Sequence, residues 1–143
     1  MSAHVERSQV IDRPVATVFH FTVDEHVKNH PRWDPDIELW LPNDESIHVG
    51  TVIRRRNSRS GTPVEGTMEV VEYEPSAAFG VLIHDGPMQI RARTTFEALG
   101  DAQSRITMSV EIPGMDDSMD KSFLLSRMDR SLGTMKQLIE SET

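Results

Sequence analysis

The sequence of 143 residues has no cysteine and no long hydrophobic run. The absence of cysteine excludes disulfides, a thiolate nucleophile and a cysteine-based zinc or iron–sulfur site. No apolar stretch approaches the ~20 residues that cross a bilayer, and residues 1–6 lack the basic and apolar segments of a signal peptide. We therefore expect a cytoplasmic protein without integral membrane association.

Positive charge is also scarce, because 15 lysines and arginines oppose 23 aspartates and glutamates and leave a formal net charge of −8. Phosphate contacts require a concentrated basic surface, so nucleic acid is not an expected partner. One basic cluster, Arg54–Arg56 together with Arg59, interrupts the acidic chain. A strand would send Arg54 and Arg56 to one face and Arg55 to the other. Either these arginines are solvated, or one of them meets an anionic group of a ligand.

The first part of the chain predicts one strand followed by two short helices. The strand runs from His4 to Asp12, and the hydrophobic spacing after it is that of a helix. Pro14 suits a first helical turn, and the Asp12 side chain is a candidate cap for it. We expect Pro31 to end the helical region, because proline has no amide hydrogen to donate.

The middle of the chain, from Ile37 to Ile112, alternates in polarity and is divided by turn residues, which indicates an antiparallel meander. Alternation is clearest in residues 88–98 and 105–112, whose apolar faces should look toward a last helix. We expect that helix to begin near Asp116 or Asp117 and to end at about Ile139. The length matches a single domain, residues 1–143.

Several short motifs occur together in a characteristic order along the chain. They are Val10-Ile11-Asp12-Arg13-Pro14-Val15 with Val18-Phe19, Trp33-Asp34-Pro35, Gly50-Thr51, Val71-Glu72-Tyr73-Glu74-Pro75 and the terminal helix. In this order they resemble the polyketide cyclase/dehydrase-like branch of the START-like (SRPBCC) superfamily. The resemblance covers nearly the whole chain and implies an α+β helix-grip fold. In that fold a curved antiparallel sheet wraps around a long C-terminal helix, and two short helices follow the first strand.

A long helix cannot contact a curved sheet everywhere, so we expect a cavity for a small apolar molecule, such as a lipid, beneath it. Its expected lining comes from the strands and the last helix. The residues are Trp40, Thr67, Val71, Tyr73, Ile90, Phe96, Met108, Val110, Leu124, Met128 and Leu132.

The strand of residues 64–73 carries two candidate bases, Glu65 and Glu69. Its alternation places them on the face opposite Met68, and the pattern alone does not decide which face is inside. Resemblance to the aromatase/cyclases implies that the glutamate face looks into the pocket and that Trp40 matches an aromatic pocket position. In those enzymes the position matching Val71 is a basic residue important for cyclisation, so valine there argues against cyclase activity. Glu65 and Glu69 are either general bases in the cavity or solvated residues.

His26 and His30 are four residues apart, which is the spacing of metal ligands on one helical face. No third ligand is evident, and Pro31 follows at the expected end of the helix. We therefore expect solvated surface histidines, no metal and no cofactor.

These observations predict a protein that holds a small, largely apolar molecule between the sheet and the last helix, as a monomer or homodimer. One alternative is a cyclase/dehydrase-type enzyme that acts by proton transfer on a bound carbonyl compound. Another is an interaction module that uses the outer face of the sheet. A buried carboxylate beside a donor would favour catalysis, whereas a closed pocket and an apolar outer face would favour interaction.

Overall fold

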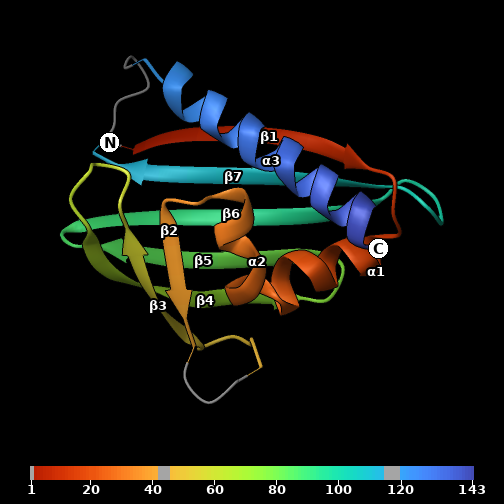
Figure 1. Ribbon diagram of the computed structural model, residues 1–143, viewed down its shortest axis with the longest axis horizontal. Coiled ribbons are helices and arrows are strands. Elements are labelled where there is room, and N and C mark those ends of the chain that lie inside the picture. The colour runs from red at the N-terminus through yellow and green to blue at the C-terminus, as the bar shows by residue number, and fades with distance from the viewer. Residues whose placement is uncertain (1, 42–45, 115–119) are drawn as a thin grey trace.

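The fold is a single curved antiparallel sheet covered on one face by helices (Figure 1). The computed structural model describes residues 2–41, 46–114 and 120–143. Its elements are β1 (Ser2–Ile11), α1 (Val15–Phe19), the π-helical turn η1 (His20–Asp24), α2 (His26–Trp33), β2 (Ile37–Trp40), β3 (Val52–Asn57), β4 (Val64–Glu74), β5 (Ala78–Asp85), β6 (Met88–Ala98), β7 (Ser104–Pro113) and α3 (Ser122–Glu142). The strand order β1-β7-β6-β5-β4-β3-β2 confirms the predicted meander and helix-grip architecture.

Two expected features of the helix ends differ from the structure, and a third lies outside the described residues. Pro31 does not end the helical region, because the amide of Asp34 donates to the carbonyl of His30 at 3.0 Å and closes a last turn around the proline. Asp12 does not cap α1: Pro14 occupies the cap position, and the Asp12 carboxylate accepts from Gln103 at 2.8 Å. Helix α3 begins at Ser122, and the expected start at Asp116 or Asp117 lies outside the described residues.

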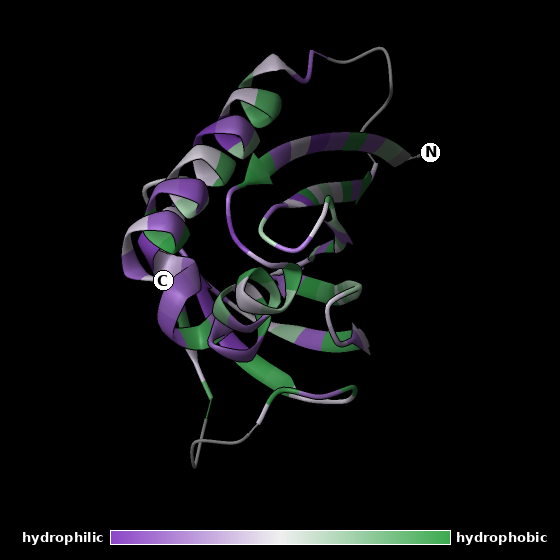
Figure 2. Ribbon diagram, turned by 90° about the vertical axis from the view of Figure 1, so that its right-hand side faces the viewer, coloured by the Kyte–Doolittle hydropathy of each residue, from purple (hydrophilic) through white to green (hydrophobic). Residues whose placement is uncertain are grey.

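The alternation of β6 and β7 has the predicted consequence. Their apolar residues face the helices and their charged residues face solvent, and Figure 2 shows such bands of opposite hydropathy along the strands. Burial of this face removes apolar area from water and stabilises the fold at roughly 25 cal/mol per Å². Fully buried side chains from β1, β3, β7 and α3 form the centre of the core, among them Ile11, Ile53, Ile106 and Ile139.

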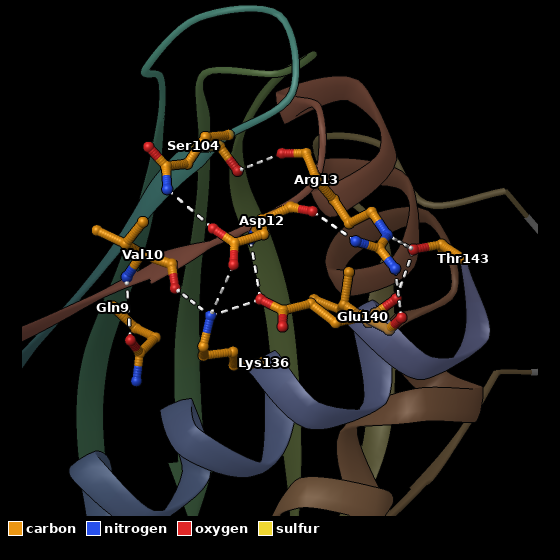
Figure 3. Close-up of polar contacts among 10 residues, drawn as sticks. Gln9, Val10, Asp12, Arg13, Ser104, Lys136, Glu140 and Thr143 are labelled. Carbon is orange, nitrogen blue, oxygen red and sulfur yellow. Dashed lines mark hydrogen bonds and ion pairs between the residues drawn. The ribbon is translucent and has the colours of Figure 1, made fainter.

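The carboxyl end of α3 is fastened to the corner between β1 and α1 (Figure 3). Lys136 Nζ donates to the Val10 carbonyl at 3.2 Å, and the Asp12 amide donates to Glu140 Oε2 at 2.9 Å. Arg13 donates to the Glu140 carbonyl and, through Nε, to Thr143 Oγ1 at 3.1 Å. In contrast, the first two turns of α3, residues 122–128, form no hydrogen bond or ion pair with another described element.

Among the described helices, α3 included, none combines the length and apolar character that a membrane crossing requires.

Candidate functional site

Two neighbouring chambers lie between the inner face of the sheet and the helices α2 and α3. The outer chamber has a volume of 310 Å³ and the inner chamber 70 Å³, and His30, Ile83, Ala92 and Met108 line both. The outer chamber falls at the lower end of the ~300–1,000 Å³ typical of small-molecule sites. We take these two chambers together as the cavity.

The wall of the outer chamber contains five of the residues predicted to bind ligand. These are Ile90, Met108, Val110, Leu124 and Met128, supplied by β6, β7 and α3. Three further predicted residues lie on the same side of the sheet but pack into the core instead. Phe96 and Tyr73 form edge-to-face contacts with Phe19, with ring centroids 5.0 and 5.5 Å apart, and Leu132 is almost wholly buried.

The remaining predicted site residues are on the outer face, so their expected position in the cavity is wrong. Val71 and Trp40 are exposed, Glu65 and Glu69 are exposed, and Thr67 is half-buried. The physical reason is the packing of the opposite face of β4, where Met68 and Val70 are almost completely buried. Tyr73 returns to the inner side because a register shift between Val70 and Glu72 changes the phase of the strand.

The outer-face residues form their own contacts. The Trp40 ring lies beneath the guanidinium groups of Arg54 and Arg56, at 5.9 and 5.4 Å from its centroid. Arg56 Nε also donates to Glu65 Oε1 at 2.7 Å. Because Glu65 is held by this solvent-exposed pair, it has no route to a ligand in the cavity.

The arginine cluster divides between the faces as predicted, and Arg55 enters the protein interior. Its Nε and Nη2 donate to the two carboxylate oxygens of Asp85 at 2.7 and 3.0 Å, and Asn57 donates to the same carboxylate at 2.9 Å. Gly66 makes this arrangement possible, because a Cβ at this position would lie 1.9 Å from the His84 carbonyl oxygen. Burial raises the pKa of Asp85, but the hydrogen bonds from Arg55 and Asn57 outweigh it and hold the pKa below its ordinary value.

A second polar group extends from α2 to the lining of the outer chamber. His26 Nδ1 lies 2.9 Å from the Thr22 carbonyl oxygen, and His30 Nδ1 lies 3.0 Å from His26 Nε2. His30 Nε2 is 3.7 Å from Asp34 Oδ2, and Asp34 also pairs with Arg59. The expectation that His26 and His30 are solvated surface residues is therefore wrong. The π-helical turn and α2 direct both rings inward, where His30 stacks on Trp33 with 5.5 Å between centroids.

Burial dominates the electrostatics of both histidines. It lowers the pKa of His26 to about 3, assisted by the neighbouring His30. Burial also lowers the pKa of His30, although the nearby Asp34 carboxylate opposes this effect. For Asp34, burial raises the pKa, but His30 and Arg59 together bring it below its ordinary value. The polar end of the cavity thus contains neutral histidines beside an ionised carboxylate at neutral pH.

Sequence reasoning noticed the two histidines but missed the group to which they belong. Their four-residue spacing continues to Asp34, and this repeat was the available signal for one polar helical face. Within the described part of the chain, no three His, Asp or Glu residues are arranged to hold a metal ion. The arrangement is suited to accepting hydrogen bonds and protons from a ligand.

Comparison with known proteins gives consistent results. The family model described as polyketide cyclase/dehydrase and lipid transport matches residues 2–140. A search of curated protein sequences finds no match. Three solved structures illustrate the similarity.

A START superfamily protein from Mycobacterium smegmatis has a TM-score of 0.78 and 14% identity, covering 98% of this chain and 99% of that one. The Zhui aromatase/cyclase from a Streptomyces species has a TM-score of 0.74 and 11% identity, covering 98% and 94%. Norcoclaurine synthase from Thalictrum flavum, solved with dopamine and hydroxybenzaldehyde, has a TM-score of 0.69 and 11% identity, covering 100% and 89%. At these identities the similarity shows a shared fold.

Proposed function

The chain belongs to the polyketide cyclase/dehydrase and lipid transport family, and we propose that it binds a small, largely apolar molecule in the cavity between the curved sheet and α3. The observation that carries the proposal is the composition of the outer chamber. Aliphatic and methionine side chains form most of its wall, and His30, Asp34 and Arg59 adjoin one another in its polar part. Such a site binds the apolar body of a ligand by burial and orients it by a few hydrogen bonds.

The orientation follows from the position of the polar groups. His30, Asp34 and Arg59 adjoin one another in the lining of the outer chamber, whereas Val110, Ile112 and Leu124 belong to its apolar wall. A ligand with one polar group would therefore direct that group toward α2 and bury its hydrocarbon part against β7 and α3. Methionine suits this role because its flexible thioether side chain adapts to irregular ligand shapes.

Three further properties remain predictions from the sequence: a cytoplasmic location, the organisation of residues 1–143 as one domain, and a monomeric or homodimeric state. The enzymatic alternative no longer rests on Glu65 or Glu69, because both are exposed on the outer face. The interaction alternative is not favoured either, because the outer face carries ion pairs such as Arg93 with Glu72 and Arg105 with Glu97.

Filling the cavity tests the binding function. We expect Met128→Trp and Val110→Trp to unfold cooperatively but to lose uptake of an apolar fluorescent probe, because each larger side chain enters the outer chamber. Val71→Trp is the matched control: Val71 is also a strand residue, but it is 44% exposed on the outer face, so this variant should bind the probe like the wild type. Undiminished binding in both cavity variants would refute the proposed cavity.

A further inference from the structure

The His26–His30–Asp34 group has a defined direction for proton transfer. A carbonyl oxygen only accepts hydrogen bonds, so His26 Nδ1, 2.9 Å from the Thr22 carbonyl, carries the hydrogen. A neutral His26 then has a bare Nε2, which can only accept. His30 Nδ1, 3.0 Å away, must therefore donate to it. In neutral His30 the free lone pair is consequently on Nε2, the nitrogen nearer to Asp34.

The His30 side chain reaches the cavity. His30 lines both chambers, and its side chain is 15% exposed. The separation of 3.7 Å between His30 Nε2 and Asp34 Oδ2 exceeds a direct hydrogen bond, so the lone pair remains available to a ligand. Stacking against Trp33 and the bond to His26 fix the plane of the ring.

The surrounding charges suit the products of proton abstraction. Asp34 is positioned to stabilise a protonated His30, in the way that a carboxylate stabilises the imidazolium of a catalytic triad. Two arginines of the same chamber, Arg59 and Arg127, can face an anion formed on the ligand. Arg59 pairs with Asp34, whereas the Arg127 side chain forms no hydrogen bond or ion pair with a described residue and contacts the ring of Phe123. Arg55 is neutralised by Asp85 and adds little net charge.

We propose that His30 is a general base that removes a proton from an acidic C–H of a bound carbonyl compound, with His26 and Asp34 as positioning residues. The C–H bond breaks, its electron pair forms an enolate, and the proton moves to His30 Nε2. Return of the proton from His30 to a different atom of the enolate completes an isomerisation that requires no other reactant. This inference rests on the proposed binding function, because the substrate occupies the same cavity.

The test uses nitrobenzisoxazole, an apolar probe that reports on a base without knowledge of the natural substrate. A base removes its ring C–H proton, the N–O bond breaks, and the electrons leave on oxygen as a coloured cyano-nitrophenolate. We expect wild-type turnover above that of free imidazole and a loss of roughly 100-fold or more in kcat/KM for His30→Asn. His84→Asn, at an exposed strand position outside the cavity, should leave the rate unchanged.

The pH profile separates a base from a structural histidine. Turnover should rise with pH and then reach a plateau. The midpoint of this rise should lie below that of free imidazole, because burial lowers the pKa of His30. Removing the opposing carboxylate in Asp34→Asn should move this midpoint further down and slow turnover. Both measurements keep the proposal testable if His30→Asn does not fold.

Binding is measured separately by displacement of anilinonaphthalene sulfonate with nitrobenzotriazole, an unreactive analogue of the probe. Displacement combined with a rate that is independent of His30 would overturn the general base and leave the binding function intact. Failure of the analogue to bind would remove the proposed function and this inference together. Displacement by the analogue, turnover by the wild type and loss of turnover in His30→Asn would together support the binding function and the general base.

Discussion

The inner and outer faces of the sheet carry arginine–carboxylate pairs of the same length in very different surroundings. Arg55 with Asp85 on the inner face and Arg93 with Glu72 on the outer face both have an N–O distance of 2.7 Å. The inner side chains are 2% and 6% exposed, and the outer ones 53% and 32%. Solvent screens the attraction within the outer pair. The two inner side chains have lost their hydration, and their contact with each other replaces it. The energetic weight of a charge in this sheet is therefore set by which face it occupies.

Breaking one pair on each face should give the largest difference. Asp85→Ala leaves Arg55 as an uncompensated buried charge, and we expect it to lower the free energy of unfolding by about 3–5 kcal/mol. Glu72→Ala removes the partner of Arg93 and should cost at most about 1 kcal/mol. Urea unfolding of both variants measures the difference. Equal losses would show that burial does not distinguish the two faces.

A smaller effect is expected from the pH dependence of stability. The pKa of His26 is about 3 in the fold and near 6.5 in the unfolded chain, so between these values the unfolded state binds a proton that the native state excludes. Stability should therefore be full above pH 6.5 and fall as the pH is lowered, by up to about 1.4 kcal/mol per pH unit from this residue.

The variant His26→Gln should flatten this slope between pH 6.5 and 4.5, above the range where Asp34 and Asp85 titrate. His84→Gln, on the exposed side of β5, should keep the wild-type slope. Urea unfolding at a series of pH values supplies the data. A His26→Gln slope identical to that of the wild type would contradict the assigned burial of the ring.

The smallest effect is expected for Glu69, a candidate base by sequence that lies on the outer face. Glu69→Gln should change the free energy of unfolding by no more than about 0.5 kcal/mol, because Glu69 is exposed on β4. It should also leave probe binding in the cavity unchanged. Urea unfolding and fluorescence titration measure the two properties. A marked loss of stability or of probe binding would indicate that Glu69 lies on the inner face.

The contrast between the faces also explains what the sequence could predict. Strands β6 and β7 alternate cleanly between apolar and polar residues, so their inner faces, including Ile90 and Val110, were correctly identified. Strand β4 has apolar and charged residues on both faces, and its orientation is decided by pairing with β3 and β5 and by the shift after Val70. Reading it by resemblance without that shift placed Glu65, Glu69 and Val71 inside.

The polar end of the cavity was harder to predict for a different reason. Arg55 and Asp85 are 30 residues apart and meet only because β3 and β5 both flank β4. No local pattern contains that information. The helical repeat of His26, His30 and Asp34 was visible, but its inward direction depends on how the π-helical turn and α2 pack against the sheet.

Among the described residues, the hydrogen bonds and ion pairs that join α3 to other elements involve its residues from Asp129 onward, which gives the helix the geometry of a lever. Its fulcrum is the corner where Lys136, Glu140 and Thr143 meet β1 and α1 (Figure 3). For any small tilt about this fulcrum, displacement grows in proportion to distance along a helix of about 30 Å. Leu124 and Met128, which line the outer chamber, lie farther from this corner than Ile139 and would move farther in such a tilt. Such a tilt would change the volume of the outer chamber at its roof while the hydrogen bonds at the corner stay in place.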